Sequence, residues 1–285
     1  MKMLLKVLAK ILSTLLSIVL LLGICTYLVL TISVKVVTKD NVKELVKYSN
    51  INEVLDSGFS NAFYSIANDN NIDSGIIDGI VNSVEFKELI GEYTGSLVEN
   101  VFYNTEVKKV TSSEIVEIAR KNLDRAANEM GYTLSKKQKE SILSEVDKVS
   151  KEFIENASLE DNLSSETLNN IKIVRTIFSD KIRILVLVTI LVITALIVVL
   201  NWSIYKFAIW IGIPTIISGG LVTAFGYAIG NMITITNYPE GLTNFISNNI
   251  SPIFMKYGII VLVIGIIEAI YYKVMKIYFN KENIN

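Results

Sequence analysis

One ionisable side chain stands inside an otherwise uncharged stretch near the end of the chain. Glu268 is the only charged residue between Tyr257 and Tyr272. An ionisable group within a membrane-spanning helix is a functional-site candidate, because a charge in lipid is costly. Glu268 precedes Lys273 by five residues, about 7 Å along a helix. The alternative is therefore a boundary residue that reaches the headgroups or pairs with Lys273 or Lys206.

A second candidate is a weak metal site. Asp69, Asn71 and Asp73 carry side-chain oxygens at alternate positions, as a calcium-binding loop does. The rest of that pattern is missing, because Ser74 replaces the turn glycine and Ile80 replaces the bidentate glutamate. The alternative is a turn in which Asp73 caps the next helix.

Four glutamates share one side of an amphipathic stretch and could attract cations: Glu85, Glu88, Glu92 and Glu99. Acidic stripes opposite an apolar stripe usually face water, so a solvated helix face is the favoured interpretation.

The chain has no histidine, which excludes Ser-His-Asp and Cys-His nucleophiles and His-ligated metals. Cys25 is the only cysteine and lies in an apolar stretch, so no intrachain disulfide can form. Catalysis by carboxylates alone would need a cleft built on strands and loops, and the sequence predicts neither. We therefore predict no catalytic residue, no cofactor and a non-enzymatic protein.

The composition indicates a membrane protein, with 51% hydrophobic residues and a mean hydropathy of +0.46. The run from Ile11 to Val34 has no charge, and the run from Ile184 to Met232 contains only Lys206. Because a spanning helix needs about 20 apolar residues, these runs and the Glu268 segment predict four spans.

The predicted order along the chain is as follows: a basic N-terminus at 1–10, span one at 11–34, an acidic helical domain at 35–183, span two at 184–201, an inner turn at 202–207, span three at 208–230, an outer loop at 231–256, span four at 257–276 and a tail at 277–285. The fold class is all-α: a four-span helical membrane protein with an extracytoplasmic helical-bundle domain inserted between spans one and two.

Basic residues set the orientation. Seven lysines fall on one side if the spans alternate: Lys2, Lys6, Lys10, Lys206, Lys273, Lys276 and Lys281. The short segments of the other side carry only Lys35 and Lys256. Since positive residues favour the cytoplasmic side, we expect both termini in the cytoplasm of a bacterial cell and the domain at 35–183 outside it.

Charge is divided unevenly between these parts. Residues 38–183 hold 18 basic and 25 acidic side chains, a net charge of −7, although the whole chain carries only −1. An acidic domain argues against nucleic acid as a partner.

Helix signals fill the acidic domain. Thr111 with Glu114, and Ser135 with Gln138, have the spacing of capping boxes, and Gly131 suits a helix end. The helix after Thr111 is expected to point these side chains inward: Val116, Ala119, Leu123, Ala126 and Met130.

No glycine or proline interrupts residues 165–200, so we predict one unbroken helix from the domain into span two. Its polar part has an apolar face of Leu168, Ile171, Val174, Phe178 and Ile182. A partner bound to the domain could tilt span two through such a rod, provided that it is continuous at Ser179 and Asp180.

Small residues recur on spans three and four: Gly212, Gly219, Gly226 and Gly230 on one, and Gly258, Gly265 and Ala269 on the other. Small faces permit close helix contact, so these spans are expected to pack as a hairpin. Residues 231–256 have an apolar face that predicts an interfacial helix on the outer leaflet, with a short re-entrant element as the alternative.

The sequence thus predicts a membrane-anchored module whose domain binds a protein or envelope partner, for scaffolding or sensing. Besides the lipid bilayer, we expect a protein partner or a second copy, through the domain or through the hairpin of spans three and four. The alternative is a transporter or channel subunit with Glu268 in the membrane path.

Overall fold

The computed structural model describes residues 2–49, 57–156, 165–235 and 239–282. Within those ranges the chain is helical and contains no strand. The predicted all-α class is therefore confirmed for the part of the chain that the structure describes. The chain divides into two compact units, which we call the span unit (Met1–Val36 and Ile177–Asn285) and the bundle unit (Val37–Thr176).

Four helices of the span unit are long and apolar enough to cross a membrane, as predicted. They are α1 (Lys2–Val36), α11 (Asp180–Leu200), α12 (Lys206–Ile235) and α14 (Ser251–Glu282). In their most apolar windows only 11–44% of residues are buried, so most of the apolar surface faces outward. Exposed apolar area of this extent is unfavourable in water and suits a lipid environment.

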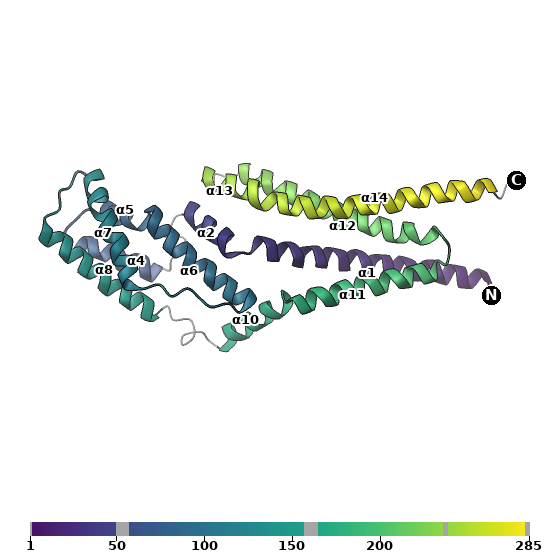
Figure 1. Ribbon diagram of the computed structural model, residues 1–285, viewed down its shortest axis with the longest axis horizontal. Coiled ribbons are helices and arrows are strands. Elements are labelled where there is room, and N and C mark those ends of the chain that lie inside the picture. Colours follow the sequence, from purple (N-terminus) through teal and green to yellow (C-terminus); the bar gives the residue numbers. More distant parts are fainter. Residues whose placement is uncertain (1, 50–56, 157–164, 236–238, 283–285) are drawn as a thin grey trace. The chain divides into compact units, whose positions relative to one another are not determined.

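Within the span unit, α12 and α14 run side by side over most of their length, and α1 packs against both α11 and α12. The start of α1 and the end of α14 lie at the same end of the span unit (Figure 1). A small apolar core forms between α1, α11 and α12 from Leu20, Ile193, Ile197 and Ile211. These contacts hold the pair of α1 and α11 against the pair of α12 and α14.

The predicted unbroken helix over residues 165–200 is wrong. Helix α10 (Ser165–Ile177) ends before Phe178, and α11 begins at Asp180. Ser179 has extended backbone angles, and its hydroxyl accepts a hydrogen bond from the Ile182 N–H at 3.4 Å. The Ser179 side chain thus replaces a helical acceptor, and Asp180 in the first turn favours the positive helix end.

The helix predicted within residues 231–256 is present in short form, and its place on the outer leaflet stays a prediction. Helix α12 continues to Ile235, and a further helix, α13 (Glu240–Phe245), leads through a π-helical turn (η1, Ile246–Ile250) into α14. Phe245 and Ile250 are buried, and this segment packs against α12. The segment therefore extends the contact between the two helices of the hairpin.

The bundle unit contains seven helices within the described residues. They are α2 (Lys39–Tyr48), α4 (Ser57–Asp69), α5 (Ser74–Val81), α6 (Val84–Tyr103), α7 (Ser112–Glu129), α8 (Lys136–Asn156) and α10. Residues 157–164, a polar stretch between α8 and α10 in the sequence, lie outside the described residues.

One apolar core holds the bundle unit together. Helices α2 and α4–α8 contribute to it, and its largest members include Phe63, Phe86, Ile115 and Ile142, all at most 1% exposed. Phe63 and Phe86 meet edge to face, with ring centroids 6.0 Å apart. Such a continuous core is what an independently folding unit requires.

Local signals in the bundle unit are confirmed in detail. Thr111 and Glu114 form the reciprocal hydrogen bonds of a capping box, and Ser135 with Gln138 repeats them. Gly131 adopts a left-handed φ of 76°, which a side chain would disfavour. Met130 was predicted to point inward, but its side chain is 47% exposed at this turn.

Candidate functional site

The contact between α12 and α14 is built on glycine. Gly212, Gly219, Gly226 and Gly230 of α12 face α14, while Gly258 and Gly265 of α14 face α12. A Cβ atom on Gly265 would lie 2.6 Å from the Ile216 nitrogen, and one on Gly226 would lie 2.7 Å from the Phe254 Cβ. Missing side chains therefore let the two backbones approach closely. Ala269 lies at this contact as well, opposite Gly212.

Hydrogen bonds from serine side chains also join helices of the span unit, and the sequence did not reveal them. The Ser251 hydroxyl donates to the Gly226 carbonyl across the hairpin at 2.8 Å. The Ser17 hydroxyl of α1 donates to the Trp210 carbonyl of α12 at 2.7 Å. Interhelical hydrogen bonds of this kind are worth about 1 kcal/mol in membranes.

Glu268 lies in this glycine interface. A Cβ atom on Gly212 would be 3.2 Å from the Glu268 Cβ, and the carboxyl group faces Thr215, which is 6% exposed. The Oε2 atom is buried and has no hydrogen-bond partner among the described residues. A buried polar atom without a partner is costly and marks a position that packing alone does not explain.

Glu268 is deeper in the hairpin than its distance from Lys273 indicates. It lies beside Gly212 and Thr215, which are six and nine residues beyond the start of α12 at Lys206. The corresponding helix rise is about 9–14 Å. Within the described residues, no ion pair joins Glu268 to Lys206 or Lys273, so the structure does not provide the pairing that a boundary residue would have.

The residues of the weak calcium candidate occupy a capped turn. Asp69 is the last residue of α4, and Asn71 adopts a left-handed φ of 50°. The Asp73 carboxylate accepts the Gly75 N–H at 2.7 Å and so caps α5. Among the described residues, no three acidic or cysteine side chains cluster closely enough to hold a metal ion.

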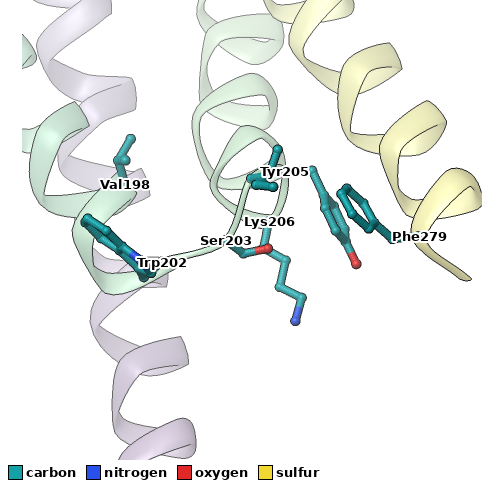
Figure 2. Close-up of a pocket in the computed structure, with 7 residues that line it drawn as sticks. Val198, Trp202, Ser203, Tyr205, Lys206 and Phe279 are labelled. Atoms are coloured by element: carbon teal, nitrogen blue, oxygen red, sulfur yellow. The ribbon is translucent and has the colours of Figure 1, made fainter. Parts of the chain in front are cut away.

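A pocket forms at the end of the span unit where α11 leads into α12 (Figure 2). Its walls include Val198 and Trp202 on one side and Tyr205 and Phe279 on another. Trp202 and Tyr205 belong to the inner turn predicted at 202–207, but the sequence could not bring Phe279 to them, since more than 70 residues separate these positions.

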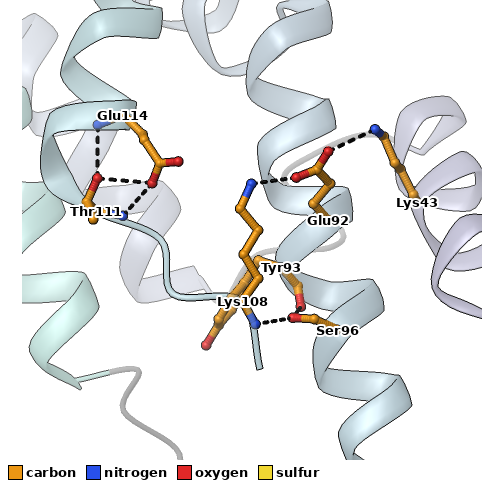
Figure 3. Close-up of polar contacts among 7 residues, drawn as sticks. All are labelled: Lys43, Glu92, Tyr93, Ser96, Lys108, Thr111 and Glu114. Carbon is orange, nitrogen blue, oxygen red and sulfur yellow. Dashed lines mark hydrogen bonds and ion pairs between the residues drawn. The ribbon is translucent and has the colours of Figure 1, made fainter. Parts of the chain in front are cut away.

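In the bundle unit, Glu92 is bound by two lysines (Figure 3). Its carboxylate accepts Lys108 Nζ at 2.5 Å and Lys43 Nζ at 3.1 Å. These two hydrogen bonds, that of Lys108 foremost, lower the pKa of Glu92 to about 2. The acidic series therefore does more than face solvent, because Glu92 links α2, α6 and the connection after α6.

Two hydrogen bonds also hold the connection after α6 against that helix. The Lys108 N–H donates to the Ser96 hydroxyl at 2.8 Å, and that hydroxyl donates to the Tyr93 carbonyl at 2.7 Å (Figure 3). Burial raises the pKa of the Tyr93 phenol. Glu99 also serves a contact, because it accepts the Lys39 N–H at 3.3 Å. These carboxylates are structural links.

Glu92 gives the bundle unit a defined dependence on pH. Because its pKa is lower in the folded chain than the ordinary 4.5, the folded state binds fewer protons. Its contribution is complete above pH 4.5 and is lost as the pH falls toward 2. We expect Glu92→Gln to lower the free energy of unfolding by about 1 kcal/mol at pH 7, the scale of a partly exposed pair. In thermal unfolding of the full chain, the variant should lose less stability than the wild type as the pH falls from 4.5 toward 2.

Glu117→Gln is the matched control for Glu92→Gln. Glu117 pairs with Lys121 four residues along the same helix, and both side chains are more than 60% exposed. Water screens such a pair, so its removal should leave the unfolding midpoint unchanged. Equal effects of the two substitutions would contradict the linking role of Glu92.

The helices and their contacts define a class of protein: an all-helical chain with four candidate membrane spans and a helical unit between the first two. Comparisons with known protein families, with curated proteins and with solved structures find no match to this chain. Its function must therefore be argued from its own residues.

Proposed function

We propose that this chain is a non-enzymatic membrane protein that presents the bundle unit on the extracytoplasmic side for binding to a protein or cell-envelope partner. The observation that carries the proposal is the compact unit Val37–Thr176, with its own core, between two candidate spans. A unit that needs no support from the spans is suited to presentation at a membrane surface.

The orientation rests on lysine positions. Lys10 lies in the first turns of α1, Lys206 is the first residue of α12, and Lys276 lies in the last turns of α14. These parts of the helices lie at the end of the span unit where both chain ends lie (Figure 1). Positive residues favour the cytoplasmic side, so this end is cytoplasmic in our proposal, and the opposite ends of α1 and α11 lead to the bundle unit outside.

The bundle unit offers a surface for a partner at the turn between α7 and α8. Met130 and Tyr132 are 47% and 43% exposed there, and exposed Met and Tyr are typical of binding surfaces. By contrast, the small-residue faces of α12 and α14 are already filled by each other. We therefore favour the bundle unit over the hairpin as the place of protein contact, and its acidic charge favours a basic partner.

Site-specific photo-crosslinking tests this proposal. A photoreactive amino acid at Tyr132 of the full chain in native membranes should give a discrete protein adduct, whether with another protein or with a second copy. The same residue at Lys121, 63% exposed elsewhere on α7, is the control. The proposal fails if Tyr132 gives no adduct beyond that of Lys121.

A second candidate function follows from Glu268: a subunit of a proton or cation pathway. The buried Oε2 atom without a partner favours it, because ionisable groups inside spans commonly serve transport. In proteoliposomes with an imposed pH gradient, we expect the wild-type chain to pass protons and Glu268→Gln to abolish this flux.

Glu240→Gln is the control for Glu268→Gln, since Glu240 lies at the start of α13 and is exposed. It should leave the flux unchanged. Equal proton flux through the wild type and Glu268→Gln would rule out the pathway and leave Glu268 as a packing residue.

A further inference from the structure

The pocket where α11 leads into α12 has a size and a lining suited to a small charged group. Its volume is about 690 Å³, within the range of small-molecule sites. Lys206 is the only charged residue that lines it, beside the Ser203 hydroxyl. In the view of Figure 2, the Lys206 side chain extends between Trp202 on one side and Tyr205 with Phe279 on the other.

Two features give the pocket a preference for anions. Lys206 supplies a full positive charge, and it is also the first residue of the 30-residue helix α12, whose N-terminus carries a partial positive charge. The last turns of α14 on either side of Phe279 carry Lys276, Lys281 and Glu282, a net charge of +1. This end of α14 therefore adds no net negative charge beside the pocket.

The pocket is held in place before any ligand binds. The Tyr205 ring stacks on Phe279, with centroids 5.7 Å apart and planes at 13°, and it also contacts Tyr272 at 5.9 Å. The Tyr271 hydroxyl donates to the Ile204 carbonyl at 2.8 Å. These contacts fasten the connection after α11 to α14, so binding would require little ordering of the walls.

The apolar side of the pocket continues along α11. Val198 lines the pocket, and the same face of α11 carries the exposed side chains of Leu191 and Leu187, seven and eleven residues before it. Trp202 is 83% exposed, and tryptophan at that level is typical of the lipid–water interface. A ligand that fits has an anionic group at Lys206 and long apolar chains along α11.

We propose that this pocket binds the headgroup of an anionic glycerophospholipid, with its phosphate at Lys206 and its acyl chains against α11. The proposal rests on the four helices lying in a bilayer and does not depend on what the bundle unit binds. A headgroup bound there would contact both α11 and α14 and so connect the two helix pairs.

The two tryptophans of the chain allow a direct measurement. Trp210→Phe leaves Trp202 as the only tryptophan. The full chain is reconstituted in phosphatidylcholine vesicles that contain a small fraction of brominated lipid, either phosphatidylglycerol or phosphatidylcholine. Bromine quenches a tryptophan in contact with the lipid that carries it. We expect the anionic lipid to be enriched at Trp202 about fivefold, the factor that one lysine supplies at an anionic surface.

Two lysine variants distinguish a specific lipid site from general attraction of anionic lipid to a basic surface. Lys206→Gln should remove the preference for brominated phosphatidylglycerol, whereas Lys273→Gln, which changes the same charge outside the pocket lining, should keep it. Equal quenching of the parent by both brominated lipids would overturn the proposal. So would equal losses in both variants, which indicate only surface attraction, or reversal by inorganic phosphate, which indicates a site for a free anion.

Discussion

Gly219→Ala is expected to destabilise the span unit by about 2 kcal/mol more than Gly220→Ala. A Cβ atom on Gly219 would lie 2.7 Å from both the Gly258 carbonyl oxygen and the Leu262 Cα. These are backbone atoms, so α12 and α14 would have to move apart, and overpacking of this kind costs about 1–3 kcal/mol. Replacing a helical glycine by alanine has the same intrinsic benefit at both positions, so the difference reports the contact alone.

Gly220 is the adjacent control, because a Cβ atom there would lie 3.6 Å from the Leu262 Cδ1, an ordinary contact. The measurement is the thermal unfolding midpoint of the full chain in detergent. For a chain of this size, we expect Gly219→Ala to lie about 5 °C below Gly220→Ala. Equal midpoints would show that α12 and α14 do not pack through Gly219.

Phe86→Ala should loosen the bundle unit and leave the span unit intact. Phe86 is 0% exposed and packs edge to face on Phe63. Removal of a buried phenylalanine side chain costs about 3–5 kcal/mol. In hydrogen exchange of the full chain, we expect the protected amides of α4 and α6 to exchange at least about a hundredfold faster.

Val84→Ala is the control on the same helix, because Val84 is 59% exposed. It should change protection by less than about 0.5 kcal/mol, as surface substitutions do. In Phe86→Ala, the amides of α12 and α14 should keep their wild-type rates. Equal acceleration there would contradict the independence of the bundle unit, on which the proposed function depends.

The features that could be predicted from sequence are those set by neighbouring residues. Four spans follow from runs of apolar residues, and the helix starts at Thr111 and Ser135 follow from side chains that bond within one turn. Recurring glycines also indicated which helix faces would meet, although the register of that contact could not be deduced.

The break at Ser179 has a local signal that the prediction of an unbroken helix did not use. Serine followed by aspartate is a common start of a helix, because the hydroxyl caps it and the carboxylate favours its positive end. No glycine or proline is needed to end the preceding helix. The rod that was expected to tilt span two is therefore interrupted at its critical point.

The candidate sites depend on contacts that spacing does not determine. The partners of Glu268 follow from the register of α12 on α14, which places Gly212 and Thr215 beside it rather than a lysine. Met130 has the helical spacing of a core residue but falls on the last turn before Gly131, where the core ends. The pocket needs Phe279 from α14 against the connection after α11.

Cysteine labelling in intact cells tests the central claim most directly, that the bundle unit and the termini lie on opposite sides of a membrane. Cys25→Ser gives a cysteine-free chain. Single cysteines then replace Lys136, which is 91% exposed in the bundle unit, and Asn280, which is exposed near the C-terminal end of α14. We predict that a membrane-impermeant maleimide labels the Lys136→Cys chain in intact cells and the Asn280→Cys chain only after permeabilisation. Labelling of Asn280→Cys in intact cells with protection of Lys136→Cys would contradict the account.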